Sequence, residues 1–267
     1  MTGPWGRPSV TVDLVIFTVL EGELKVLLIR RGGEPCKGML ALPGGFVDAG
    51  NAGLARSPGE PEDQGEDVEA AALRELGEET ALDAALLRRH RVHLEQLYTF
   101  GRTGRDPRTR VITVAYYALV PPELVPLVQA GDDAAEAHWY TVANDVPWSQ
   151  LAFDHADILS TGLTRIRGKL DHAPIAFALV PSIFTASELR AVHEAIRHQR
   201  IDAANFRRRL NRMLEDGLIV PVPEKRPPGG RGGRPATQYR FRAAGRDPGG
   251  DRGEGNRGGK PGSGTFC

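Results

Sequence analysis

The chain has 267 residues, with 34 basic and 34 acidic side chains. A domain usually has about 100–200 residues, so this length predicts two modest domains. A hydrophobic fraction of 40% and a charged fraction of 25% exclude collagen-like and wholly disordered chains. No apolar run reaches the roughly 18 residues of a membrane span, the first residues do not form a secretory signal, and two cysteines are too few for a disulfide framework. We therefore expect a cytoplasmic protein.

The first part of the chain predicts three extended segments. Residues 10–20 and 24–31 are rich in Val, Ile, Leu and Phe on either side of a Glu-Gly-Glu turn, which predicts a hairpin. Residues 39–47 contain a proline and a Gly-Gly pair, which interrupt strand pairing and allow the backbone to approach a neighbour closely. Residues 51–64 have no periodic apolar pattern, so we interpret them as an exposed loop insertion.

A helix and more strands complete the predicted first domain. Residues 66–80 consist mostly of strong helix formers, with acidic residues in the first turn, where the helix dipole favours them. Residues 154–170 place five apolar side chains on one helical stripe and predict a closing amphipathic helix. Further strands are expected at 94–101, 111–120 and 137–142. The sheet should therefore be mixed, with at least five strands.

The remainder predicts two helices followed by a hairpin. Thr185 and Glu188 form a capping-box pattern at the start of a helix of about twelve residues. Asp202 can cap a second helix, which ends before Gly217. The apolar stripe of this second helix is Phe206, Leu210, Met213 and Leu214. Strands at 218–222 and 237–242 flank a basic loop rich in proline and glycine. This order is that of a winged helix-turn-helix.

The expected organisation is therefore a two-domain chain with tails. Its segments are an N-terminal tail (1–9), an α/β (α+β) domain (10–171) that contains the 51–64 insertion, a winged helix-turn-helix domain (172–243) and a C-terminal tail (244–267). The last segment has nine glycines and no apolar pattern, so burial cannot offset the entropy of ordering it, and we expect disorder there.

The helix expected at 66–80 has an acidic face. Glu75, Glu78 and Glu79 lie at steps of three and four residues, where the preceding pattern would place apolar side chains. The three like charges repel one another, whereas convergence of their oxygens on one point would suit a hard cation such as Mg²⁺. A solvated acidic face is the alternative interpretation of these charges alone.

The surrounding residues form a long motif. Across the insertion, residues 42–50 (LPGGFVDAG) join residues 65–82 (GEDVEAAALRELGEETAL) in the pattern Gly-x5-Glu-x7-Arg-Glu-Leu-x-Glu-Glu-x-x-Leu, with Gly45 and Glu66 in place. This pattern resembles the Nudix box, and the resemblance extends over most of residues 10–165. It implies a Nudix fold and the Mg²⁺- or Mn²⁺-dependent hydrolysis of a diphosphate linked to a nucleoside.

The resemblance also implies roles for individual residues. Glu75, Glu78 and Glu79 would be metal ligands, Glu79 or Glu78 would activate the attacking water, and Arg74 would be an orienting catalytic residue. Gly44 and Gly45 would shape the nucleotide-binding loop. Two features depart from the family pattern: Ala81 stands where the box has glycine, and fourteen residues are inserted.

A second resemblance concerns the nucleotide. Residues 96–119 resemble the hairpin of Nudix proteins that handle ADP-ribose, which implies nucleotide contacts for Tyr98, Arg108 and Arg110. Taken singly, these residues are equally compatible with a strand aromatic and two solvated arginines.

The C-terminal domain is strongly basic. Residues 200–242 contain eleven basic and four acidic side chains. Because the whole chain has equal numbers of both, the rest of the chain must carry an equal excess of acidic side chains. Burial of the apolar stripe turns Asn205, Arg207, Arg208, Arg209 and Arg212 outward. A helix about 10–12 Å wide fits the major groove of DNA, where Arg can read guanine and Asn can read adenine, so Asn205 is the expected base reader. The wing would add salt-sensitive phosphate contacts through Lys225, Arg226, Arg231 and Arg234. A solvated arginine face is the alternative.

A Nudix-like domain followed by APIAFALVPSIFTASEL and NFRRRLNRMLEDG resembles the Nudix-related transcriptional regulators of the NrtR family. The resemblance implies a homodimeric repressor of NAD-metabolism or pentose-utilisation genes, which ADP-ribose or a related nucleotide releases from its double-stranded DNA operator. The rival hypothesis is a Mg²⁺-dependent ADP-ribose pyrophosphatase with an accessory winged helix, and the intact glutamates favour it. An RNA-binding or scaffold protein with a vestigial fold is a third interpretation, which fits less of the chain.

Overall fold

The structure is a computed structural model that describes residues 7–50, 64–82, 84–90, 92–128, 134–172, 174–227 and 235–242. Most of the predicted insertion, the wing residues Arg231 and Arg234 and the predicted C-terminal tail lie outside the described residues. Within them, no helix combines the length and the apolar character that crossing a membrane requires.

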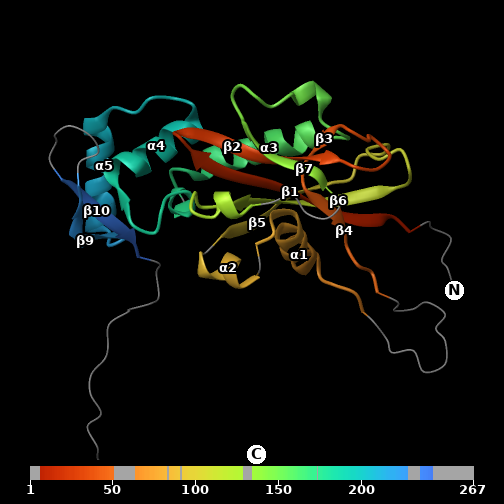
Figure 1. Cartoon of the computed structure of the whole chain (residues 1–267), viewed down its shortest axis with the longest axis horizontal. Helices are drawn as coiled ribbons and strands as arrows, with labels where there is room; N and C mark the ends of the chain where they lie inside the picture. The colour runs from red at the N-terminus through yellow and green to blue at the C-terminus, as the bar shows by residue number, and fades with distance from the viewer. Residues whose placement is uncertain are drawn as a thin grey trace, which may run out of the picture.

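The N-terminal part is built around a mixed sheet (Figure 1). Its strands are β1 (Ser9–Leu20), β2 (Glu23–Arg31), β3 (Leu40–Ala41), β4 (Gly44–Phe46), β5 (His93–Phe100), β6 (Val111–Leu119) and β7 (Ala134–Thr141). The order is β3-β2-β1-β6-β5, while β4 pairs with β1 and β7 pairs with β2. Only β1 and β6 pair in parallel among the pairs described, and the others are antiparallel. The expected mixed sheet is thus confirmed.

The extended stretch predicted at 39–47 contains two short strands, with the expected interruption of pairing between them. β3 pairs with β2, whereas β4 pairs with β1, and Leu42 and Pro43 lie between them. Proline lacks the N–H that a continuous strand would need, so the chain changes partner at this point.

Helices cover both faces of the sheet, and these are α1 (Val68–Thr80), α2 (Ala84–Arg89) and α3 (His155–Lys169). Alternate residues of β1 explain this arrangement, because side chains along a strand point to opposite faces. Leu14 and Ile16 pack in the cluster that contains α1, whereas Val15 and Phe17 pack in the cluster that contains α3. A strand buried on both faces has the nearly continuous apolar sequence seen at 10–20.

Helix α1 ends where the family motif has lost its glycine. Ala81 forms the C-cap in the left-handed region with φ of 54°, a conformation that glycine adopts without steric cost. The helix therefore stops at the expected place despite the substitution. The short helix α2 that follows, and the 3-10 turns η1 (Val125–Leu127), η2 (Trp148–Gln150) and η3 (Pro174–Ala178), lack a periodic pattern long enough to predict them.

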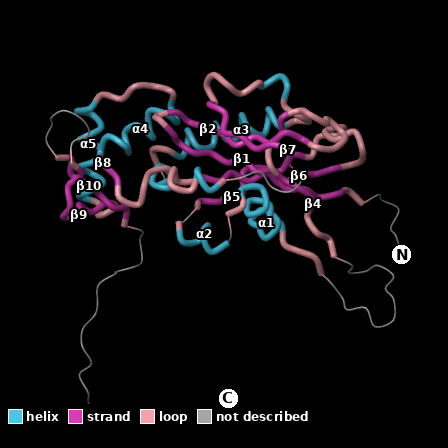
Figure 2. The backbone as a smooth tube through the Cα atoms, in the orientation of Figure 1, coloured by secondary structure: helices cyan, strands magenta, loops and turns pink. Residues whose placement is uncertain are grey.

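The C-terminal part contains two helices and a three-stranded sheet (Figure 2). Its elements are β8 (Phe184–Thr185), α4 (Ala186–Arg197), α5 (Ala203–Glu215), β9 (Ile219–Arg226) and β10 (Ala236–Phe241). The Thr185–Glu188 capping box is complete, and Asp202 accepts a hydrogen bond from the Asn205 N–H at 2.9 Å. Strand β9 runs to Arg226, so residues 223–226, predicted as wing loop, belong to the strand, and Lys225 and Arg226 pair with β10.

One hydrophobic cluster continues from the α3 face of the large sheet into the C-terminal part. It contains Ile166 of α3, Leu189 of α4 and Leu210 of α5, all buried. Polar contacts strengthen the junction, because the Arg167 Nε donates to the Ile196 carbonyl at 3.0 Å. The two parts therefore pack against each other through α3.

Candidate functional site

Two glycines bring the backbone of β4 against its neighbours. Gly44 has φ of 151°, and a Cβ there would lie 2.2 Å from the Val12 carbonyl oxygen. A Cβ on Gly45 would lie 2.2 Å from Glu75 Oε1, so only glycine allows the Glu75 carboxylate to lie beside this strand. The predicted role of both glycines in shaping the loop has this physical basis.

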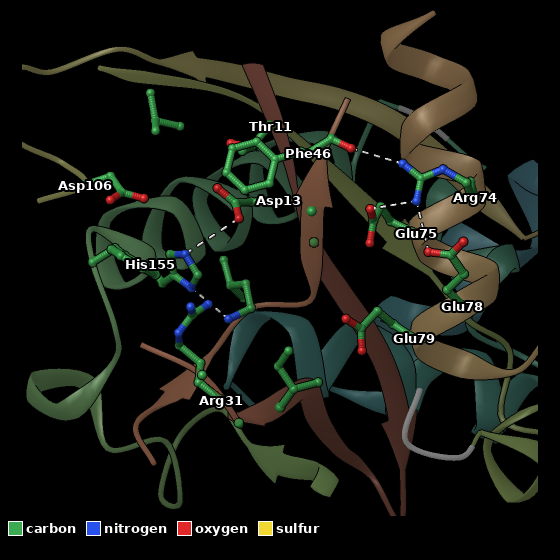
Figure 3. A pocket seen from close by; sticks show the side chains of 18 of the residues that line it. Thr11, Asp13, Arg31, Phe46, Arg74, Glu75, Glu78, Glu79, Asp106 and His155 are labelled. Carbon is green, nitrogen blue, oxygen red and sulfur yellow. Dashed lines mark hydrogen bonds and ion pairs between the residues drawn. The ribbon is translucent and has the colours of Figure 1, made fainter. Parts of the chain in front are cut away.

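Arg74 is the centre of a carboxylate network on α1 (Figure 3). Its Nε and Nη2 donate to the two oxygens of Glu66 at 3.1 and 2.7 Å, and its Nη1 donates to Glu75 Oε1 at 2.8 Å and to Glu78 Oε2 at 2.9 Å. Its Nη2 also donates to the Phe46 carbonyl at 3.1 Å. These contacts raise the pKa of Arg74 further, and the hydrogen bonds that it donates to Glu66 contribute most. The glutamates are thus held by a permanently charged fork.

The predicted convergence of three carboxylates on one point is not what the described residues show. No group of three Asp, Glu, His or Cys side chains in the described part of the chain is arranged to hold a metal ion. Glu75 and Glu78 converge on the guanidinium of Arg74 instead, which relieves the repulsion between them. Glu75 and Glu79 are buried, and burial raises the pKa of the Glu75 carboxyl although Arg74 opposes this.

These side chains line one cleft of about 1180 Å³. Glu75, Glu78 and Glu79 border it together with Gly45, and all the donors are oxygen atoms of the kind that Mg²⁺ and Mn²⁺ prefer. The carboxylate oxygens therefore fit a hard divalent cation. In this structure, however, the carboxylates of Glu75 and Glu78 are paired with Arg74.

A buried polar network forms another wall of the cleft. Arg105 donates to both oxygens of Asp154, at 3.0 and 2.7 Å, and to Asp13 Oδ2 at 3.2 Å. His155 Nδ1 accepts the Leu42 N–H at 2.8 Å, and burial lowers the pKa of this histidine, although the nearby aspartates oppose the shift. The network fixes the 101–110 loop to β1 and to the start of α3. Sequence reasoning missed it, and the available signal was Asp13 inside an apolar strand.

The predicted nucleotide contacts separate into two groups. Gly44, Gly45 and Arg108 line the cleft, but Tyr98 and Arg110 are not among its lining residues. Tyr98 is 62% exposed on β5 and packs edge-on against Phe100. Arg110 Nη1 donates to the Arg102 carbonyl at 3.1 Å.

The predicted DNA-contacting residues are also divided. The exposed ones are Asn205, Arg207, Arg208 and Arg212 on α5 and Lys225 on β9. Arg209 does not point freely outward as predicted, because it donates to Asp171 Oδ1 at 2.6 Å and to the Leu170 carbonyl at 2.9 Å. Arg226 binds Glu188 and donates to the Ile183 carbonyl at 3.3 Å. The helix thus keeps a basic exposed face while one arginine ties it to the end of α3.

His193 lies beneath this junction. It is 1% exposed on α4, its ring meets that of Phe206 at 5.4 Å, and neither ring nitrogen has a hydrogen-bond partner among the described residues. Burial, together with the charges of Arg209 and Arg197, lowers its pKa to about 3. The histidine is therefore a neutral core residue at neutral pH.

Comparison with known families follows the same division of the chain. Residues 9–159 match the NUDIX domain family, and residues 176–241 match the NrtR DNA-binding winged helix domain. The fold and the cleft therefore define a Nudix domain joined to a DNA-binding winged helix. The chain belongs to the Nudix family, in its NrtR branch of transcriptional regulators.

Individual relatives agree with this assignment. The chain is 33% identical over 234 residues to the ADPR responsive transcriptional repressor NtrR of Acinetobacter baylyi, covering 88% of this chain and 82% of the relative. It is 37% identical over 154 residues to an ADP-ribose pyrophosphatase of Methanocaldococcus jannaschii, covering 57% and 72%. The crystal structure of Shewanella oneidensis NrtR complexed with a 27mer DNA aligns with a TM-score of 0.64 and 29% identity, covering 87% of this chain and 93% of that chain.

Proposed function

We propose that the chain is a DNA-binding transcriptional repressor whose affinity for its operator responds to ADP-ribose or a related nucleotide. Residues 10–171 would sense the nucleotide, and residues 172–243 would bind DNA. The observation that carries the proposal is that Arg209 of the basic helix α5 hydrogen-bonds to Leu170 and Asp171, directly after α3, while α3 itself starts at the wall of the Nudix cleft. The repressor of Acinetobacter baylyi supports the same function.

DNA recognition would use the exposed face of α5. Asn205 near its start can contact a base edge in the major groove, and Arg207, Arg208 and Arg212 can contact bases or phosphates. Lys225 and the wing arginines, including Arg231 and Arg234, would add phosphate contacts that weaken with salt. A homodimer would present two such helices to the two halves of a palindromic operator. The proposed targets are NAD-metabolism or pentose-utilisation genes, and the proposed location of the protein is the cytoplasm.

The cleft would hold the nucleotide with its diphosphate near the α1 glutamates. Glu75, Glu78 and Glu79 would hold Mg²⁺ or Mn²⁺, and a cation bound there polarises a phosphate and lowers the pKa of a bound water. Because Arg74 already binds two of these carboxylates, it would orient them, and Gly44 and Gly45 would shape the loop that lies against Val12 and Glu75.

Helix α3 offers a physical route between the two sites. At its start, Asp154 is held by Arg105 of the cleft, and just beyond its end, Asp171 holds Arg209 of α5. A nucleotide that moves the Arg105 loop would shift α3 and change the position of α5. Such a ligand alters DNA affinity only by binding one arrangement more tightly than the other.

A second function, ADP-ribose hydrolysis, is supported by the complete glutamate set and by the similarity to an ADP-ribose pyrophosphatase. Glu79 or Glu78 would then activate the attacking water. In that case Glu79→Gln should reduce Mg²⁺-dependent release of AMP about a hundredfold or more and leave DNA binding unchanged. An unchanged rate of AMP release would remove Glu79 from the proposed metal site.

The deciding experiment measures both activities in one sample. The fluorescence anisotropy of a labelled duplex from the region upstream of the protein's own gene is followed with and without ADP-ribose, and the same mixture is then assayed for AMP. Release of DNA without AMP identifies a sensor, and release with slow AMP formation identifies a sensor that also hydrolyses its effector. No DNA binding at modest salt would refute the repressor proposal and leave the hydrolase.

A further inference from the structure

Phe46 is an exposed aromatic side chain in the Nudix cleft. It is 49% exposed, although phenylalanine is among the side chains most often buried. Its backbone is fixed, because its carbonyl accepts the Arg74 hydrogen bond at 3.1 Å and the preceding Gly45 lies against Glu75. In Figure 3 the ring lies between the α1 carboxylates and Asp106. The backbone thus belongs to the acidic end of the cleft, while the ring is open to a ligand.

Arg108 covers this ring. Its Cζ lies 5.7 Å from the centroid of the Phe46 ring. Its Nε and Nη2 donate to the two oxygens of Asp106 at 3.1 and 2.8 Å, and Asp106 itself is 7% exposed. A guanidinium that makes two hydrogen bonds to one carboxylate has a defined plane on which a ligand can stack, although its exposed side chain can still shift.

The cleft contains one other pair of this kind, which is less suited to a ligand. Arg31 lies 4.9 Å from the centroid of the Phe153 ring, and that ring also meets His155 at 5.4 Å. Phe153 is only partly exposed and packs against the hydrophobic cluster around Ile29. Phe46 therefore offers the more accessible aromatic face.

We propose that Phe46 and Arg108 form the nucleobase subsite of this cleft and take the purine of a nucleoside diphosphate between them. The inference rests on the proposed nucleotide-sensing function and assigns the base to one end of the cleft. Aromatic rings and guanidinium planes both stack on bases, and a base between two such layers needs a separation of about 7 Å, twice the usual carbon contact. Arg108 must therefore move outward by about 1 Å, which its 43% exposed side chain allows.

This subsite also orients the nucleotide. Phe46 directly follows Gly45, whose backbone lies against Glu75, so a base on the Phe46 ring has its diphosphate within reach of Arg74 and the α1 glutamates. Tyr98, an aromatic residue that the family resemblance implies as a nucleotide contact, lies outside the cleft lining. Substitution of Phe46 should therefore weaken nucleotide binding, whereas substitution of Tyr98 should not.

The test uses the full chain, Mg²⁺ and the α,β-methylene analogue of ADP-ribose, which cannot be hydrolysed at the diphosphate. Titration calorimetry should show affinity about tenfold lower for Phe46→Leu, which keeps an apolar side chain but removes the ring. Phe46→Trp should bind within about twofold of the parent because it keeps a stacking surface. Leu73→Ala, which alters a 45% exposed apolar residue of α1 outside the cleft lining, and Tyr98→Leu should bind as the parent does.

A spectroscopic signature separates stacking from a general change in the cleft. The adenine H2 and H8 resonances of the bound analogue should shift upfield in the ring current of Phe46, and the shift should shrink in Phe46→Leu at saturating ligand. Unchanged affinity and unchanged shifts in Phe46→Leu would overturn the subsite while leaving nucleotide sensing intact. Loss of binding in Tyr98→Leu alone would place the base elsewhere. Absence of binding by the parent protein would refute the proposed function itself.

Discussion

The cleft and the α5 surface both depend on arginine, but they hold it in different ways. In the cleft, Arg74, Arg105 and Arg108 each make several hydrogen bonds to carboxylates, and Arg105 is only 8% exposed. On α5, Arg207 and Arg212 are exposed to solvent. A fixed guanidinium recognises the geometry of a small ligand, whereas an exposed one adapts to phosphates and releases their counterions.

The difference predicts that substitutions in the two regions have different consequences. A change in the cleft removes a contact from a packed network, so it should alter stability and ligand geometry together. A change on the exposed face of α5 should alter DNA affinity and its salt dependence with little effect on folding.

Replacing Arg208 and Arg212 together by alanine should weaken DNA binding about a hundredfold or more, because each arginine contacts a base or a phosphate in the proposed complex. The slope of affinity against salt should also become shallower. Anisotropy titrations at several salt concentrations measure both effects. The matched control is Arg88→Ala with Arg89→Ala, which removes the same charge from the exposed end of α2. Equal losses in the two double variants would mean that DNA binding depends only on net charge.

Gly45→Ala should destabilise the Nudix domain by about 1–3 kcal/mol, the usual cost of overpacking. The new Cβ would lie 2.2 Å from Glu75 Oε1, and that carboxylate is fixed by Arg74. Urea unfolding followed by circular dichroism measures the change. In the control Gly168→Ala, nothing lies within 4 Å of the new Cβ and the residue is in a helix, so a small gain in stability is expected. A Gly45→Ala protein as stable as the parent would contradict the close packing of β4 on α1.

His193 should make the protein less stable in mild acid. The ordinary pKa of 6.5 applies to the unfolded chain, whereas burial lowers the pKa in the folded chain to about 3. Between these values the unfolded chain binds the additional proton, so the free energy of unfolding decreases as the pH falls below 6.5, by up to about 1.4 kcal/mol per pH unit.

Urea unfolding of the parent and of His193→Leu between pH 7 and pH 5 measures this contribution as the difference between the two slopes. His172→Leu, at an exposed position, should keep the slope of the parent protein. If His193→Leu and the parent lost stability equally over this range, the pKa of His193 would not be lowered by folding.

Asp171→Ala should have the smallest effect and the opposite sign, strengthening DNA binding about two- to fivefold. The substitution removes a carboxylate from the junction and frees Arg209 to meet a phosphate, but the ion pair is 31% and 43% exposed and therefore weak. The response to ADP-ribose should also diminish if this contact transmits it. Asp157→Ala removes the same charge from the exposed side of α3 and should leave both properties unchanged. Weaker DNA binding by Asp171→Ala would show that Asp171 positions Arg209 productively.

Local patterns in the sequence were sufficient to predict most of the regular elements. The apolar runs of β1 and β2, the helix formers of α1 and the caps at Thr185 and Asp202 act within a few residues, so their structural consequences can be read from neighbouring side chains. The prediction was wrong where pairing extended a strand into the expected wing loop, at 223–226, whereas the interruption expected within 39–47 is present. Pairing depends on the other strand, which local patterns do not include.

Periodicity and charge spacing along the chain specify which side of an element is buried, so they were enough to predict the mixed sheet, the winged helix, the acidic face of α1 and the basic face of α5. They could not predict which charges meet, because that depends on how distant elements pack. Asp13 and Arg105 are 92 residues apart, Arg105 and Asp154 are 49 apart, and Arg209 and Asp171 are 38 apart. Such pairs form when separate elements pack around one core. For the buried Asp13, Arg105 and Asp154, the low dielectric of the interior also requires each charge to have a partner, wherever that partner lies in the chain.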